Sequence, residues 1–238
     1  MASAVQQGVT STSRPESRFP GDVITGICMI VGPVILVITS VLAIGIYHAA
    51  GIDYVRGMAA HHTRTAAEFD LFIAGWMFLI FALIGLANRI TAVRPWLGRA
   101  AGIVSIVGLF GPVFFNGVYF GGFQLTDPSR QTAAGYLIDH AQIIPSNVIN
   151  ISGPALVIGF ILLALGAAKA GVLCRPRAVA LGLSCVMSAG FISGYMIIAV
   201  VAFLGMALAL VPLGVSLLRS HPAREGSLAP TRRQAAQG

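Results

Sequence analysis

Residues 69–87 read FDLFIAGWMFLIFALIGLA, and the single charged side chain in this run is Asp70. A bilayer core of about 30 Å needs roughly 20 helical residues to cross it, so such a run predicts a membrane-spanning helix. Hydrocarbon offers no water to the backbone, and a helix satisfies its own N–H and C=O groups. The stretch therefore indicates an all-α membrane protein.

Five further apolar runs give the rest of the chain the same character. The predicted spans are residues 23–47, 69–87, 100–123, 147–168, 178–193 and 195–218. Residues 178–218 are long enough for one exceptional helix or for two spans joined at Ser193 and Gly194, and we favour two. Only 10% of the residues are charged, against about 25% in soluble domains. The sequence predicts a polytopic membrane helical bundle with six transmembrane helices.

The basic residues are spread unevenly over these spans and predict the orientation. With the N-terminus in the cytoplasm, twelve Lys and Arg residues fall inside and only Arg56, Arg64 and Arg130 fall outside. Cytoplasmic loops carry such an excess, so both termini are expected in the cytoplasm, which requires an even number of spans. This distribution also explains the net charge of +7 without a nucleic-acid partner.

The two ends of the chain differ in composition from its apolar middle. Residues 1–22 and 220–238 are polar and predict disordered cytoplasmic tails on one transmembrane domain of residues 23–219. The first apolar run is longer than the h-region of a cleavable signal peptide. None of the three cysteines has a partner on the outer side, so no structural disulfide is expected. No CxxC, Walker A, GxGxxG or HExxH pattern occurs, which leaves redox-dithiol, P-loop and zincin chemistry without support.

Polar and aromatic residues gather on the predicted outer side. Five of the eight acids and four of the five histidines lie there, and so do most of the aromatic residues. The inner side offers few aromatics beyond Phe19 and Trp96. Aromatic belts form at both membrane interfaces. The asymmetry therefore favours an aromatic-lined cavity that opens outward, with a belt as the alternative.

Two acids of the second span lie at its outer boundary. Glu68, Phe72 and Trp76 share one helical face at spacings of four and eight, whereas Asp70 faces elsewhere. A surface ion pair between Arg64 and Glu68 at i, i+4 is the simpler role for Glu68. The alternative is that Glu68 and Asp70 are candidate acids of the cavity.

The third and fourth spans add amide and aromatic side chains near the same boundary. Asn116 lies within a span and needs a hydrogen-bonding partner, either on another helix or on a ligand. Asp139 and His140 precede the fourth span, in an interfacial helix or an exposed loop. The residues that we expect to line a pocket between the second, third and fourth spans are Phe72, Trp76, Phe115, Asn116, Tyr119, Phe120, His140, Asn147 and Asn150. The outer histidines and acids have no spacing typical of a metal site, so no metal is expected.

An acid beside aromatic side chains at the hydrocarbon boundary suits one kind of reaction well. Burial disfavours a charged carboxylate, and a neutral carboxylic acid has a proton to donate. Aromatic faces stabilise cations by about 0.5–2 kcal/mol each. Both are requirements of proton-initiated cyclisation of a polyene, in which a carbocation moves along an apolar wall.

The small size, the charged outer loops and the grouping of Glu68, Asp70, Trp76 and Asp139 resemble the small integral-membrane terpene cyclases. These are the actinobacterial drimentine-type enzymes and, more distantly, the fungal meroterpenoid cyclases. The resemblance implies cofactor-independent cyclisation of an isoprenoid or prenylated substrate, with Glu68, Asp70 or Asp139 as the initiating acid. The six predicted spans differ from the seven of the fungal group. No DDxxD motif occurs, and such families need none.

A non-enzymatic binding, transport or accessory role in the membrane is the alternative. Transporters often carry ionisable groups near the bilayer midplane, and no predicted span of this chain carries one there. That absence weakens proton-coupled transport but not lipid binding. A metal-dependent or redox enzyme that uses the outer histidines is a third possibility. We expect a multi-pass protein of a bacterial cell membrane, with its substrate and oligomeric state left open.

Overall fold

The computed structural model describes residues 21–46, 51–140, 146–186 and 196–219, and all regular elements within these ranges are helical. The elements are α1 (Asp22–Ala43), α2 (Gly51–Ala60), α3 (His62–Val93), α4 (Pro95–Phe123), α5 (Gln131–His140), α6 (Ser146–Lys169), α7 (Arg175–Leu183), the 3-10 turn η1 (Ser184–Val186) and α9 (Met196–Arg219). The proposed tails and the junction at Ser193 and Gly194 lie outside the described residues.

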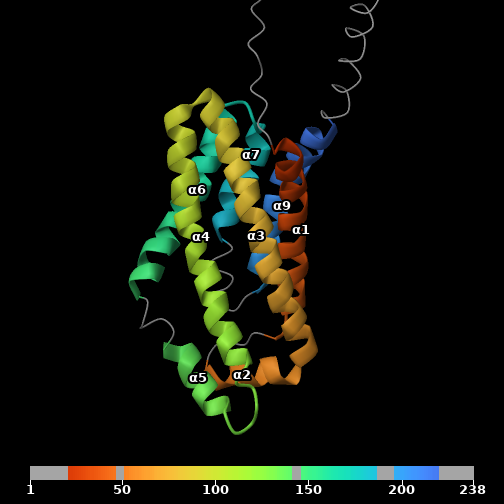
Figure 1. Ribbon diagram of the computed structural model, residues 1–238, viewed down its shortest axis with the longest axis vertical. Helices are drawn as coiled ribbons and strands as arrows, with labels where there is room; N and C mark the ends of the chain where they lie inside the picture. The colour runs from red at the N-terminus through yellow and green to blue at the C-terminus, as the bar shows by residue number, and fades with distance from the viewer. Residues whose placement is uncertain (1–20, 47–50, 141–145, 187–195, 220–238) are drawn as a thin grey trace, which may run out of the picture.

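The long helices stand side by side in one bundle (Figure 1). α3 packs against α1 on one side and α4 on the other, while α9 packs against α1 and α6 against α4. The short helices α2 and α5 contact each other at one end of the bundle, which we call the α2–α5 end. α1 begins and α9 ends at the opposite end.

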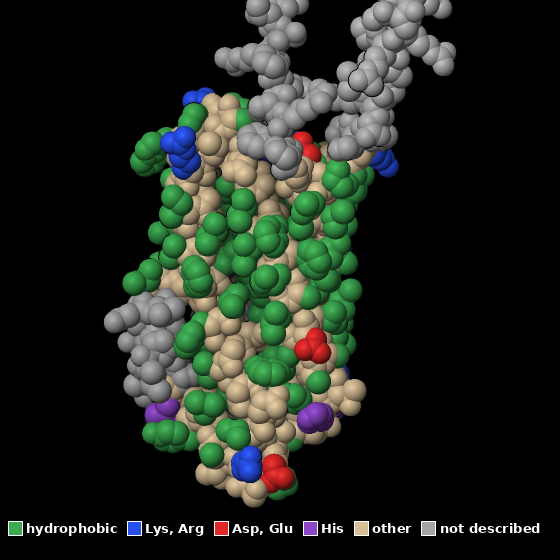
Figure 2. Space-filling view, in the orientation of Figure 1, with side chains coloured by type: hydrophobic (Ala, Val, Ile, Leu, Met, Phe, Trp, Pro, Cys, Tyr) green, Lys and Arg blue, Asp and Glu red, His purple; other side chains and the backbone are tan. Residues whose placement is uncertain are grey.

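Five helices are long and apolar enough to cross a membrane: α1, α3, α4, residues 151–169 of α6, and α9. Their outward faces carry large apolar side chains such as Met77, Phe110 and Leu208, and hydrophobic atoms cover most of the flank in Figure 2. In water such a surface would be strongly unfavourable, whereas lipid solvates it. The chain therefore has the architecture of a multi-pass membrane protein.

These five helices correspond to five of the six predicted spans and confirm the all-helical membrane architecture. The fifth predicted span, residues 178–193, is described only as far as residue 186, as α7 and η1. A sixth crossing therefore stays a prediction, and so does the placement of both termini in the cytoplasm.

α3 and α4 are longer than a bilayer requires. At 1.5 Å per residue, the 32 residues of α3 extend about 48 Å, against a hydrocarbon core of about 30 Å. Pro95 separates the two helices, because the residue before a proline is disfavoured in helical conformation, and Arg94 has φ −133° and ψ 80°. The surplus length of α3 and α4 reaches the α2–α5 end, where α2 contacts both helices.

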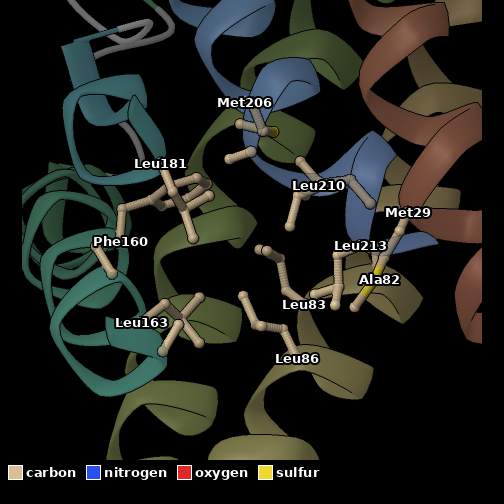
Figure 3. Close-up of a cluster of buried hydrophobic side chains, with 14 of the residues drawn as sticks. Met29, Ala82, Leu83, Leu86, Phe160, Leu163, Leu181, Met206, Leu210 and Leu213 are labelled. Carbon is tan, nitrogen blue, oxygen red and sulfur yellow. The ribbon is translucent and has the colours of Figure 1, made fainter. Parts of the chain in front are cut away.

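The main core of the bundle is formed by apolar side chains from α1, α3, α4, α6, α7 and α9, ten of which are labelled in Figure 3. The helices approach closely at glycines. A Cβ added to Gly32 of α1 would lie 2.9 Å from the backbone N of Leu79 in α3. A Cβ on Gly159 of α6 would lie 2.6 Å from the Cα of Ser105 in α4. Small residues let helix backbones come together in lipid, where van der Waals packing replaces the hydrophobic effect.

A second, smaller core lies at the α2–α5 end. Its buried members are Ala43, Ile46, Val55, Met58, Phe69, Phe123, Ala134, Ile138 and Met196. Val55 and Met58 come from α2, whereas Ala134 and Ile138 come from α5. The two short helices thus cover the projecting ends of α3 and α4 with apolar side chains.

Candidate functional site

One face of α3 carries a buried acid between aromatic side chains. Glu68 is 3% exposed, Phe72 is 5% exposed and Trp76 is 1% exposed. These three residues, at spacings of four and eight, therefore lie on one buried face of α3, as predicted. Thr65, one turn before Glu68, is also buried, and its Oγ1 donates to the carbonyl oxygen of His61 at 3.1 Å. A polar segment thus enters the apolar interior near the α2–α5 end.

The other two candidate acids are placed differently. Asp70 is exposed, on the side of α3 that also carries the exposed residues Ile73 and Met77. Asp139 is exposed on α5. Among the residues whose burial is described, Glu68 is the one buried acid. The structure therefore separates the three candidates by environment.

The helix contacts show which residues are level with Glu68. A Cβ added to Gly32 of α1 would meet Leu79 of α3, and one added to Gly75 of α3 would meet Leu36 of α1. The two helices are therefore antiparallel, with Leu36 opposite Gly75. Continuing this register brings Ser40 level with the turn of α3 that follows Glu68. Ser40 is 1% exposed, and its Oγ has no hydrogen-bond partner within the described part of the chain.

The register between α3 and α4 gives the level of Asn116 along the bundle. The rings of Phe69 and Phe120 lie 5.7 Å apart edge to face, which sets the register between α3 and α4 and brings Asn116 level with Phe72. Asn116 is buried, as predicted, and no hydrogen bond to its amide is present among the described residues. Ser40 and Asn116 thus lie within about two helical turns of Glu68 along the bundle, whose interior is otherwise largely apolar.

Aromatic rings connect this layer to the neighbouring helices. Phe69 also approaches Phe123 at 5.6 Å, and Tyr119 stacks on Tyr54 of α2 at 4.9 Å and on Phe115 at 6.2 Å. Phe115 and Tyr119 are half-buried and Phe120 is 40% exposed, so these predicted pocket residues line the periphery rather than the centre.

Deeper in the bundle, the ring of Trp76 lies 5.6 Å from Phe72 and 6.2 Å from Phe203 of α9. Trp76 Nε1 is buried without a hydrogen-bond partner among the described residues. Sequence reasoning missed Phe203, because α9 is apolar on all sides and periodicity does not reveal which side faces inward.

Arg64 serves another purpose than the surface pair considered above. Its guanidinium donates to the carbonyl oxygens of Ile44 at 2.6 Å and Val41 at 3.4 Å. These carbonyls lie at the C-terminus of α1, where the helix dipole favours a cation. Arg64 therefore ties the start of α3 to the end of α1.

The remaining predicted residues lie at the margin. His140 is half-buried at the end of α5, where its Nδ1 lies 2.9 Å from the carbonyl oxygen of Tyr136. Asn147 and Asn150 belong to the first turns of α6, but their side chains lie outside the described residues. Within the described part, no three residues among His, Cys, Asp and Glu gather closely enough to hold a metal ion.

One acid in the loop before α5 has a clear electrostatic environment. The carboxylate of Asp127 accepts hydrogen bonds from the Ser129 hydroxyl and from the Ser129 backbone N–H, the latter at 2.9 Å. These hydrogen bonds, helped by the charge of Arg130, lower the pKa of Asp127 below its ordinary value. Its role is to order the turn that leads into α5.

No protein-family model matches this chain, and neither a curated protein nor a solved structure matches it. Its function therefore has to be inferred from its own residues.

Proposed function

We propose that this protein is a cofactor-independent membrane terpene cyclase in which Glu68 donates the initiating proton to an isoprenoid or prenylated substrate. One observation carries the proposal: Glu68 is the one buried acid among the described residues, on the same face of α3 as Phe72 and Trp76. Of the three acids that the sequence offered, Asp70 and Asp139 are exposed and are less suited to the role.

The residues around Glu68 suit the chemistry step by step. The carboxyl proton of Glu68 adds to an alkene carbon, and the cation that results moves as new C–C bonds form. The rings of Phe72, Trp76 and Phe203 are buried and lie near one another, which suits stabilisation of such a cation. A water molecule at the membrane boundary accepts a proton from a carbon next to the final cation and ends the reaction, so the product is an isomer of the substrate, and the Glu68 carboxylate regains its proton from solvent.

Polar groups near this depth suit orientation of the substrate. The Asn116 amide and the Trp76 indole N–H have no hydrogen-bond partner among the described residues. A hydroxyl or carbonyl group of a prenylated substrate would satisfy such a donor. Glu68 and Trp76 are eight residues apart, so the two groups are separated by about 12 Å along α3. An extended chain along this face therefore suits the site better than a small compact molecule.

The test is metal-free incubation of detergent-purified protein with linear prenylated indoles, phenols and epoxides, followed by mass spectrometry and NMR. We expect a cyclic isomer of the substrate, and in D2O an alkene-initiated product should carry one added deuterium. Glu68→Gln is expected to lower the rate at least about 100-fold, because the acid is lost. Asp70→Asn and Asp139→Asn are matched controls that retain activity. Full activity in the Glu68→Gln variant, or in the triple amide variant, would refute the mechanism.

A binding or accessory function is the second candidate, favoured by the lack of a second buried acid among the described residues. A cyclase needs a base or water to end the reaction, whereas a lipid-binding protein needs only the apolar site. Unchanged substrate throughout the panel, combined with saturable retention of one prenylated compound, would support binding without catalysis.

The finer topology forms part of the same proposal: six spans in a bacterial cell membrane, both termini in the cytoplasm and the α2–α5 end outside. The basic residues support this orientation. The test is labelling with a membrane-impermeant maleimide. Cys174 is exposed, and in the proposed topology it faces the cytoplasm, so it should react only after permeabilisation. Arg130→Cys, in a Cys174→Ser background, should react in intact cells. The reverse pattern would overturn the orientation.

A further inference from the structure

The end of the bundle opposite α2 and α5 carries more positive charge than its own acids neutralise. We call it the basic end, and its members are Arg89, Arg94, Arg99, Lys169, Arg175, Arg177 and Arg219. Asp22 is the one acid described there, and it pairs with Arg89 at 2.8 Å. The other six cations are exposed and make no ion pair with any described residue. Lys and Arg side chains are visible at this end in Figure 2.

The cations of the α2–α5 end have a different environment. Arg56 pairs with Asp53 at 3.1 Å, and Arg64 donates to the carbonyl oxygen of Ile44. Arg130 lies near the carboxylate of Asp127 and contributes to its low pKa. Arg56 and Arg64 thus have partners within the protein and Arg130 has an acid nearby, whereas six of the seven cations of the basic end make no ion pair with a described residue.

Two turns bring several of the available cations together. The α3–α4 turn carries Arg94 and Arg99, and the α6–α7 turn, with the residues beside it, carries Lys169, Arg175 and Arg177. The two turns adjoin, since a Cβ added to Gly166 near the end of α6 would lie 3.4 Å from Leu97 of α4. The cations of the two turns therefore lie on neighbouring segments, and we call them together the rim.

Apolar side chains accompany this rim. Trp96, between Arg94 and Arg99, is 84% exposed, and Val93 and Val179 are also largely exposed. Tryptophan is enriched at the level of lipid headgroups, where its ring lies in the interface. A soluble anion would need only the cations, whereas a phospholipid would engage the cations with its phosphate and the exposed apolar side chains with its glycerol and acyl groups.

We infer that the α3–α4 and α6–α7 turns bind the headgroups of anionic phospholipids, through Arg94, Arg99, Arg175 and Arg177. A guanidinium presents paired N–H donors that match two phosphate oxygens. Basic residues at the membrane surface attract anionic lipids, by about a fivefold gain in affinity per charge. This binding is independent of the proposed catalysis, which lies at the other end of the molecule.

Fluorescence of Trp96 offers a direct test, because the chain has only two tryptophans and Trp76 is the other. The Trp76→Phe protein is reconstituted in phosphatidylcholine vesicles that contain a small fraction of brominated phosphatidylglycerol, whose bromines quench a nearby indole. We expect stronger quenching than with the same fraction of brominated phosphatidylcholine. The excess should decrease as salt rises to about 1 M, because screening weakens the attraction.

Matched variants identify the residues. Changing Arg94, Arg99, Arg175 and Arg177 together to Gln should abolish the excess quenching, whereas Arg56→Gln with Arg130→Gln at the other end should leave it unchanged. Soluble glycerol phosphate should not compete, because it lacks the apolar portion; competition would identify a phosphate site instead. Equal quenching by the two brominated lipids would overturn the proposal.

Native mass spectrometry of the wild-type protein provides a second measurement if the Trp76→Phe variant does not fold. The protein should retain phosphatidylglycerol in preference to phosphatidylcholine, and the four-Gln variant should lose that preference. Indiscriminate retention of the two lipids would contradict the inference whether or not the protein proves to be a cyclase.

Discussion

The bundle core and the core at the α2–α5 end are held together by different kinds of contact. In the bundle core the helix backbones approach at glycines, as where a Cβ on Gly108 of α4 would meet the backbone of Leu156 in α6. At the α2–α5 end a glycine also approaches a backbone, since a Cβ on Gly57 would overlap the carbonyl oxygen of Ile46. Large rings fill more of the space there, and Phe69 contacts both Phe120 and Phe123. Close backbone packing leaves little room for a substrate, whereas packed rings can be rearranged more easily.

The two cores are also expected to differ in role, the bundle core being structural and the α2–α5 end chemical. The buried acid Glu68 lies near the boundary of the two cores, beside the ring of Phe72 and one turn after buried Thr65. A polar group buried in lipid is expensive and usually functional. The bundle core therefore supplies a rigid frame, and the chemistry is expected where that frame gives way to aromatic side chains. Each prediction below tests one side of this contrast.

The largest effect is expected from enlarging a glycine of the bundle core. Gly108→Leu should prevent α4 from packing on α6, because its Cβ would overlap backbone atoms, which cannot move aside as a flexible side chain can. Gly117→Leu in the same helix is the matched control, since a Cβ there meets nothing within 4 Å. Size-exclusion chromatography in detergent should give a monodisperse peak for the control and aggregate for Gly108→Leu. Equal behaviour of the two variants would mean that the close approach is unimportant.

The next effect concerns the aromatic packing. Phe69→Ala should cost about 3 kcal/mol, because Phe69 is 2% exposed and its removal leaves a cavity beside Phe120 and Phe123. Phe81→Ala in the same helix is the control, with a ring that is 52% exposed on the lipid-facing side. Equilibrium unfolding in mixed micelles, followed by tryptophan fluorescence, measures both. A loss in the control as large as that for Phe69→Ala would remove the distinction between the two sides of α3.

The buried stripe of α3 could be predicted from sequence because helical periodicity survives in a span that still contains one acid and one tryptophan. Spacings of four and eight placed Glu68, Phe72 and Trp76 on one face, and all three are buried. The burial of Asn116 was likewise predictable, since an amide within a span is expected to face the protein interior, whereas the expected polar partner is absent among the described residues. These inferences depend only on local geometry and on the cost of burying polar groups.

Other parts of the fold depend on contacts between segments that are distant in the sequence, and the local sequence pattern gives little sign of them. Helix α2 is only ten residues long, and the spacing of Val55 and Met58 is its main trace in a segment of mixed composition. Its burial comes from α5, more than 70 residues later in the chain. On α5 the side with Ala134 and Ile138 packs inward, whereas Ala133 and Leu137 on another side are exposed. Which side a short helix buries is decided by its partner.

A smaller effect is expected where Arg64 joins the two regions. Arg64→Gln should destabilise the last turn of α1 by about 1 kcal/mol, because the carbonyl of Ile44 loses a charged donor at a helix C-terminus. Arg64→Lys should recover part of this loss, since it keeps the charge. Arg56→Gln, which removes an exposed ion pair with Asp53, should have almost no effect. Hydrogen exchange of the last amides of α1 measures the change. Identical exchange in the Arg64→Gln and Arg56→Gln variants would show that Arg64 does not tie the helices.

The smallest effect is a pH dependence confined to the turn before α5. Hydrogen bonds from Ser129 lower the pKa of Asp127 in the folded protein, so the carboxylate stabilises the turn above its ordinary pKa of about 3.9. That stability should be lost as pH falls below this value and through the folded pKa. Exchange of amides 129–134, corrected for intrinsic rates, should therefore accelerate as the pH falls below about 4. The acceleration should be absent in Asp127→Ala, which lacks the acceptor at every pH, and present in Asp139→Asn. If Asp127→Ala kept the wild-type profile, the Ser129 contacts would not be what orders α5, and the α2–α5 end would depend on its apolar core alone.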